Sequence, residues 1–156
     1  MPTLLDRHGP LADAHPEPVT LSDWLADRDA VRAAAGGRAP AVLLGPADDP
    51  EALAADLPAL GLIAIAFPRF TDGRGRSLAR LLRERLGWTG PLRAVGDVAV
   101  DQMYALARCG FDQFALRDGD DPAVALKALD TFHEAYQAAV DRGPLFARRF
   151  GLEGAR

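Results

Sequence analysis

The sequence predicts a single α/β domain with about four mostly parallel strands alternating with helices, in a flavodoxin-like or half-barrel arrangement. Four short apolar runs are separated by helical patterns, which is the order of a parallel sheet with crossover helices. The runs are apolar at consecutive positions, as strands are when both faces of the sheet are covered. A chain of 156 residues, 49 % of them apolar, suits one domain with a buried core.

The helices are predicted from their caps and their apolar stripes. Thr20 or Ser22 can cap the first helix, and Asp-Pro pairs at 49–50 and 121–122 place a capping acid before a proline that suits the first helical position. Leucines spaced at i, i+3, i+4 and i+8 mark the third helix. In chain order, the predicted helices cover residues 20–35, 50–57, 77–86, 99–109 and 122–141.

The strands are predicted from short apolar runs bounded by glycine, proline or aspartate. They cover residues 41–44, 62–67, 92–95 and 111–116. Pro10, Pro16 and Pro18 predict that residues 1–18 are an irregular N-terminal arm, because proline interrupts regular structure. Residues 19–142 then form the domain, and residues 143–156 a loosely ordered tail.

Composition and sequence patterns argue against several classes of function. No run of 18 or more apolar residues is present and the N-terminus lacks an apolar signal core, so we expect a cytoplasmic protein without membrane contact. The net charge of −4 argues against a nucleic-acid partner. Cys109 is the single cysteine, which excludes an internal disulfide. Neither metal-ligand spacing nor a nucleotide-binding fingerprint occurs, so no metal or cofactor is expected.

Positive charge is concentrated in one segment. Residues 69–93 hold seven arginines against two acidic residues, a local charge of +5 in a chain that is otherwise acidic. The segment begins at the carboxyl end of strand 62–67, continues through a glycine-containing loop and includes helix 77–86. Because ligands of parallel α/β sheets bind at the carboxyl ends of strands, this loop is the first candidate site.

The loop suits a small oxyanion or an acidic partner. Gly73 and Gly75 permit a tight turn with positive φ, and the backbone amides at the start of the helix near Ser77 favour an anion. The arginines contribute bidentate donors, and three of them form a stripe along the helix at positions 76, 80 and 83. The alternative is that Asp72 pairs with an arginine, the glycines only turn the chain and the stripe is a solvated face. The candidate binding residues here are Asp72, Gly73, Arg74, Arg76, Ser77 and Arg80.

A second loop follows strand 92–95. Asp97 lies there and has the chemistry of a general base, although it also suits a helix cap. Asp101 and Gln102 lie one turn later and are expected to share the same opening. Arg93, within the strand, needs a partner if the sheet is buried, and Asp72 or Asp97 is the natural candidate.

These residues form a pattern that resembles a known family. Its blocks are Phe67-Pro-x-Phe70, Thr71-Asp72-Gly73-Arg74, Ser77-x-Ala79-Arg80-Leu81-Leu82-Arg83, Leu92-Arg93-Ala94-Val95-Gly96-Asp97-Val98, Asp101-Gln102 and Arg108-Cys109-Gly110-Phe111-Asp112-x-Phe114. In this order and spacing they resemble DUF934, a bacterial family of unknown function, over about residues 41–137. The resemblance implies that the candidate residues above are family-signature positions, except Arg76, where members commonly have an aromatic or aliphatic residue.

The resemblance also implies a biological setting, because members are often encoded beside assimilatory sulfite reductase. It favours a small accessory protein of sulfite reduction that binds a sulfur oxyanion or the reductase through Arg74, Arg76, Arg80 and Arg93. The alternative is an enzyme that acts on a phosphorylated or sulfonated small molecule, with Asp97 as general base. The sequence leaves open whether the protein is an enzyme.

Overall fold

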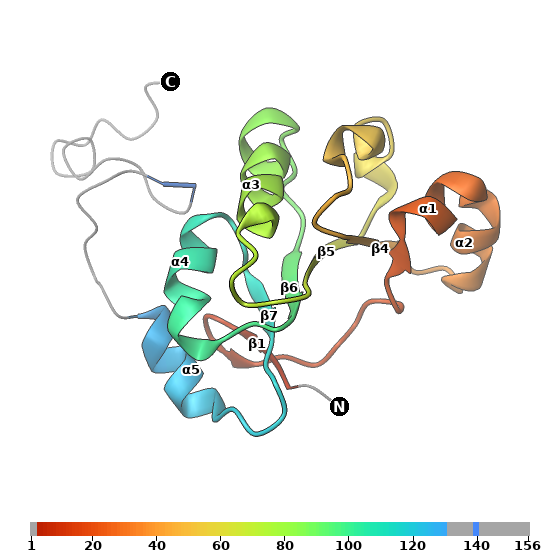
Figure 1. Cartoon of the computed structure of the whole chain (residues 1–156). Coiled ribbons are helices and arrows are strands. Elements are labelled where there is room, and N and C mark those ends of the chain that lie inside the picture. The colour runs from red at the N-terminus through yellow and green to blue at the C-terminus, as the bar shows by residue number, and fades with distance from the viewer. Residues whose placement is uncertain (1–2, 131–138, 141–156) are drawn as a thin grey trace, which may run out of the picture.

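The computed structural model describes residues 3–130 and 139–140 (Figure 1). Within them the chain forms a mixed α/β domain around one sheet of seven strands. The strands are β1 (Leu4–Asp6), β2 (Gly9–Pro10), β3 (Val19–Thr20), β4 (Ala41–Leu44), β5 (Leu62–Phe67), β6 (Leu92–Gly96) and β7 (Gln113–Ala115). The α-helices are α1 (Leu21–Ala26), α2 (Arg28–Ala34), α3 (Arg74–Arg80), α4 (Met103–Arg108) and α5 (Pro122–Leu129).

The four predicted strands are present and parallel. The sheet order is β2-β1-β7-β6-β5-β4-β3, and the pairs from β3 to β7 are all parallel. The N-terminal arm is not irregular throughout, because β1 pairs antiparallel with β7 and β2 with β1. The prolines of the arm do not prevent this pairing: Pro10 lies in β2 at the sheet edge, where a missing amide costs little.

From β3 to β7, each strand lies on the same side of the strand that precedes it in the sequence. Successive strands are neighbours, so right-handed crossovers place every connecting helix on the same face. In Figure 1 the helices form an arc around the strands, from α5 through α4 and α3 to α1 and α2, while the N-terminal segment passes on the other side. This is the half-barrel winding: the connecting helices cover one face of the sheet, and the N-terminal arm crosses the other.

Residue alternation divides the sheet into a helix-covered face and an inner face. Val42, Ile63, Ile65 and Phe114 belong to one continuous core with the apolar side chains of the helices. Their neighbours in the strands, including Ala64 and Ala115, are buried but lie outside this core. They face away from the helices, toward the side crossed by the arm.

Several helices differ from their predicted extent. The first is broken at Asp27, which ends α1 and caps α2. The second is only two 3₁₀ turns, η1 (Pro50–Leu53) and η2 (Leu57–Ala59), although Asp49 caps the first as expected. A 3₁₀ turn, η4 (Val100–Gln102), precedes α4. Helix 122–141 is described as far as Leu129, and its remainder, like the tail at 143–156, lies outside the described residues.

The helix predicted over residues 77–86 begins earlier and changes type. It starts as α3 at Arg74 and continues as a π-helical turn, η3 (Leu81–Arg85). Gly75 lets α3 approach β5 closely, since a β-carbon there would lie 2.6 Å from the ring of Phe67. The glycine thus serves packing against the sheet.

Candidate functional site at the carboxyl edge of the sheet

Two loops meet where β5 and β6 end. The backbone amide of Asp97 donates to the carbonyl of Phe67 at 2.7 Å, which ties the start of the second loop to the end of β5. Gly96 makes this approach possible: its φ is +94°, and a β-carbon would lie 2.5 Å from the same carbonyl oxygen. The predicted convergence of the two loops is therefore present.

Asp97 holds the two loops together. Its Oδ2 accepts the backbone amide of Phe70 at 2.9 Å, and its Oδ1 accepts a guanidinium N–H of Arg117 at 3.2 Å. Gln102 completes the link, because its side-chain amide donates to the carbonyl of Phe70 at 2.9 Å. Both backbone groups of Phe70 are thus fixed, while the residue as a whole is 53 % exposed. The carboxylate does not cap the following helix, because η4 has Ala99 at its N-cap.

The loop before α3 already contains its own anion. Asp72 forms an exposed pair with Arg74 at 2.7 Å and also accepts the backbone amide of Arg74 at 3.1 Å. The side-chain hydrogen bond from Arg74 lowers the pKa of Asp72, and the same bond raises the pKa of Arg74. Gly73 has φ of −77°, so the predicted positive φ is wrong there. The helix start carries an internal carboxylate where the sequence suggested room for an external oxyanion.

The remaining candidate residues of these loops point to solvent. Ser77, Arg80 and Asp101 are exposed and Arg76 is half-buried. Their side chains form no hydrogen bond or ion pair with any residue in the described part of the chain. Gly75, Leu78 and Ala79 form the buried side of α3, which leaves Arg74, Ser77 and Arg80 on the outer side.

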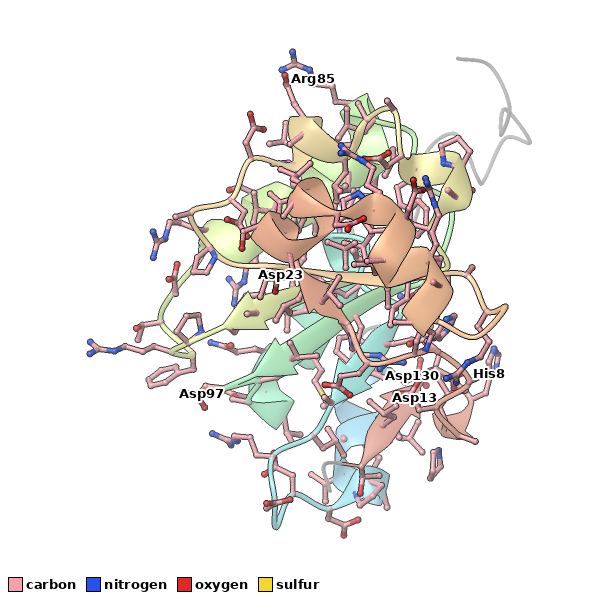
Figure 2. All side chains as sticks on the ribbon, turned by 90° about the vertical axis from the view of Figure 1, so that its right-hand side faces the viewer. His8, Asp13, Asp23, Arg85, Asp97 and Asp130 are labelled. Atoms are coloured by element: carbon pink, nitrogen blue, oxygen red, sulfur yellow. The ribbon has the colours of Figure 1, made fainter. Side chains whose placement is uncertain are left out.

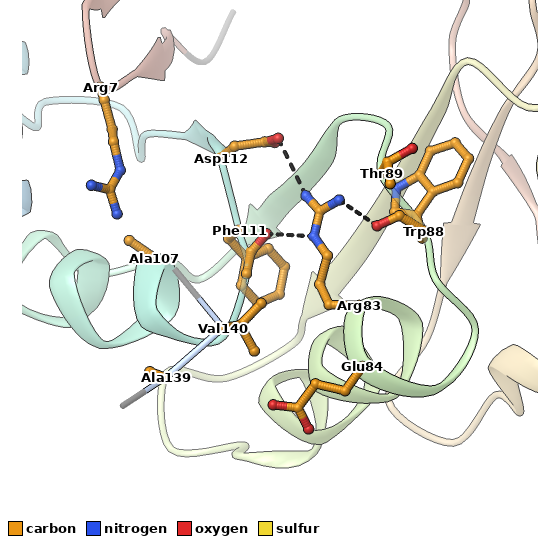
Figure 3. Close-up of a pocket in the computed structure, with 11 residues that line it drawn as sticks. Arg7, Arg83, Glu84, Trp88, Thr89, Ala107, Phe111, Asp112, Ala139 and Val140 are labelled. Carbon is orange, nitrogen blue, oxygen red and sulfur yellow. Dashed lines mark hydrogen bonds and ion pairs between the residues drawn. The ribbon is translucent and has the colours of Figure 1, made fainter. Parts of the chain in front are cut away.

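Arg83 does not belong to the basic stripe. The change from α- to π-helix at Leu81 alters the angle between successive residues, and Arg83 turns toward the sheet. Its guanidinium donates to the carbonyls of Gly110 and Trp88 at 3.0 and 2.8 Å and pairs with Asp112 at 3.2 Å (Figure 3). It also donates to the carbonyl of Gly90 at 2.8 Å. Burial lowers the pKa of Arg83 and raises that of Asp112. This network closes the opposite, amino-terminal edge of the sheet.

Arg93 is also separate from the loops. The prediction that it pairs with Asp72 or Asp97 is wrong: it forms a bidentate pair with Asp13 of the arm at 2.8 and 2.9 Å, and its Nε donates to Gln113. Arg93 points from β6 into the inner face, whereas Asp97 lies at the strand end. Figure 2 shows Asp97 and Asp13 well apart.

The structure thus brings together only part of the predicted site. Asp97 and Gln102 share Phe70, and Asp72 lies in the same loop with Arg74, whereas Arg93 belongs to another face. Three contributors were missed by sequence reasoning: Phe70, Arg117 and Asp13. Arg117 directly follows β7, so the rule that sites form at carboxyl ends of strands could have found it.

Of three cavities, two lie away from these loops, and the third also reaches Gly96 and Arg117 at the carboxyl edge. They are lined by residues of the amino-terminal edge, of α2 with the arm, and of the inner face. Asp72, Arg74 and Asp97 line none of the three. The described residues also contain no group of three or more His, Cys, Asp or Glu side chains placed to hold a metal ion. Within the described ranges, no helix has the length and apolar character needed to cross a bilayer.

Fold and site together define a singly wound α/β protein whose carboxyl edge presents a rigid aromatic–arginine loop. The sequence model of the family described as bacterial protein of unknown function (DUF934) matches residues 41–146. The chain belongs to this family. No curated protein and no solved structure matches it.

Proposed function

We propose that the protein is a cytoplasmic, non-catalytic accessory protein of assimilatory sulfite reduction that docks on an acidic surface of a partner. The observation that carries the proposal is the exposed ring of Phe70 on a loop whose backbone is fixed by Asp97 and Gln102. An exposed aromatic ring on a rigid backbone loses little entropy on binding, and such rings contribute strongly to protein interfaces.

Several arginines lie close to Phe70 in the sequence. Arg69, Arg74 and Arg80 are exposed, and Arg76 is half-buried. We call the exposed side chains of residues 69–80 the Phe70 surface. Arginine is enriched at protein interfaces, and cations on an otherwise acidic protein steer an acidic partner to one face. Because Asp72 already occupies the helix start, this surface suits a protein partner better than a single small oxyanion.

The sulfite reductase is the partner to test first, since members of the DUF934 family are often encoded beside it. The enzyme alternative requires Asp97 as a free base within a cavity. Both carboxylate oxygens of Asp97 accept hydrogen bonds, from Phe70 and Arg117. A carboxylate so engaged is better suited to holding the loops than to removing a proton from a substrate.

The test is direct binding of purified sulfite reductase to the wild-type protein and to Phe70→Ser. We expect Phe70→Ser to weaken binding at least tenfold, as removal of a central aromatic contact does, and higher salt to weaken wild-type binding. Val124→Ser is the matched control, because Val124 is an apolar side chain of the same 53 % exposure on α5. Equal loss in both variants, or no binding by the wild type, would overturn the docking proposal.

Charge is tested in the same assay. Arg76→Ala and Arg80→Ala should weaken binding and reduce its salt dependence, whereas the exposed Arg38→Ala should leave both unchanged. A deletion strain should grow on sulfide or cysteine and fail on sulfate and sulfite. Normal growth on sulfate would argue against a role in sulfite reduction even if the Phe70 surface binds another partner.

A further inference from the structure

The inner face of the sheet holds a cavity with a buried cation. Its floor is formed by side chains of five neighbouring strands, and the arm residues Asp13, Glu17 and Pro18 also line it. The volume is about 760 Å³, within the usual range for small-molecule sites. The floor residues are Leu4, Leu43, Ala64, Val95 and Ala115, with Arg93 among them.

Arg93 carries more hydrogen-bond donors than its partners among the described residues accept. Its side chain is only 4 % exposed, so its hydrogen-bonding groups depend on partners within the protein or a ligand. Asp13 accepts one N–H from each η nitrogen, and Gln113 accepts the Nε–H. Each η nitrogen carries two N–H groups, and the second of each has no acceptor among the described residues.

Asp13 binds Arg93 as a carboxylate ligand would. Its two oxygens accept from the two η nitrogens at 2.8 and 2.9 Å, which is the bidentate geometry typical of guanidinium–carboxylate recognition. The arm has few other ties at this point: residues 12–17 form no backbone–backbone hydrogen bond with the described remainder of the chain. The carboxylate of Asp13 is therefore the principal polar anchor of this part of the arm.

We propose that the inner-face cavity is a binding site for a small molecule with a carboxylate and a short apolar body, and that Asp13 is its internal competitor. The ligand carboxylate replaces Asp13 on Arg93, and its apolar body lies on the floor formed by Leu43, Ala64 and Ala115. The exchange keeps the charge beside Arg93 unchanged, because one carboxylate replaces another. Once displaced, Asp13 becomes exposed to solvent together with the rest of residues 12–17.

The exchange is favourable only if the ligand adds apolar contact that Asp13 does not make. Affinity should therefore rise with chain length, by about fourfold for each methylene that becomes buried. The remaining charges around the cavity, Glu17, Arg117 and Asp118, sum to −1 and do not favour a second anionic group on the ligand.

The probe is hexanoate, titrated into the full-length protein and followed by backbone-amide NMR. Hexanoate should shift the amides of residues 12–17 and of Ala115. Asp13→Ala should bind it at least tenfold more tightly, because the internal competitor is gone. Asp29→Ala is the matched control, since it removes an exposed aspartate of α2, and should leave the affinity unchanged.

Three results would overturn the proposal. One is binding that persists unchanged in Arg93→Gln, another is equal affinity for acetate and hexanoate, and the third is equal affinity for hexan-1-ol. If neither variant folds, judged by amide dispersion, the wild-type titration decides: hexanoate that fails to shift residues 12–17 contradicts the site. Chain-length dependence together with loss in Arg93→Gln supports it.

Discussion

Arg83 and Arg85 offer a matched test of what burial does to an arginine. Both lie in η3, and their ion pairs have similar lengths, 3.2 Å to Asp112 and 3.0 Å to Glu51. Their surroundings differ: the side chain of Arg83 is 13 % exposed and that of Arg85 is 66 % exposed. Replacing each with methionine keeps most of the apolar length and removes the charge and the donors.

The structure predicts unequal costs. In Arg83→Met, the carbonyls of Trp88, Gly90 and Gly110 lose a donor, and Asp112 loses its cation. Removing one partner of a buried pair costs about 3–5 kcal/mol of unfolding free energy. The adjoining hollow admits water to part of this network, so we expect a loss of about 3 kcal/mol, near the lower limit. An exposed pair such as that of Arg85 contributes at most about 1 kcal/mol.

Urea unfolding of the wild type and both variants measures these losses, provided that the slopes with denaturant agree. The double variant Arg83→Met/Asp112→Asn should lose less than the sum of its single changes, because the neutral amide at position 112 no longer leaves a carboxylate without its cation. A cost for Arg83→Met within about 1 kcal/mol of that for Arg85→Met would refute the reasoning that burial makes the Arg83 network stabilising.

Two further predictions concern the sheet edge and the arm. Gly96→Ala should lower the unfolding free energy by at least about 2 kcal/mol, because it combines a strained φ with a clash against the carbonyl of Phe67. The control, Gly73→Ala, has open space at its β-carbon and should change the unfolding free energy by less than about 1 kcal/mol. Equal effects of the two variants in urea unfolding would contradict the role given to the Gly96 turn. The hydrogen bond from Arg93 lowers the pKa of Asp13, so this carboxylate stabilises the fold above its ordinary pKa of 3.8 and the stabilisation is lost as the pH falls through the lower folded value. Wild type should therefore exceed Asp13→Asn in stability at neutral pH, and a difference that persists at strongly acid pH would contradict the pair's role.

Local signals predicted the local structure well. The strand over residues 41–44 and the strand over 62–67 agree with β4 and β5 at both ends. Thr20 and Asp121 cap α1 and α5 through their side chains, as expected from their positions before the helices. These features depend on neighbouring residues, so one short window of sequence contains what determines them.

The incorrect predictions concern features that depend on contacts between residues far apart in the sequence. Arg93 meets Asp13, 80 positions earlier, and no periodicity connects the arm to β6. The short stretch from Pro50 has an aspartate cap and a proline start, yet it forms 3₁₀ turns. The cap marks where a turn begins, but tertiary packing decides which helix type follows and how long it lasts. For the same reason, the α-to-π change at Leu81 could not be inferred from leucine spacing.

The position of Arg93 nevertheless follows from topology once the strand order is known. When neighbouring strands follow one another in sequence order and the crossovers are right-handed, all helices lie on one face of the sheet. Every second residue of a strand must then face the opposite side of the sheet. Leu92 and Ala94 belong to the core shared with the helices, and Arg93 between them must therefore point to the inner face. An arginine on this face needs an anion there, and its partner is not Asp97. The arm supplies one in Asp13, and a carboxylate ligand of the proposed kind would meet the same requirement.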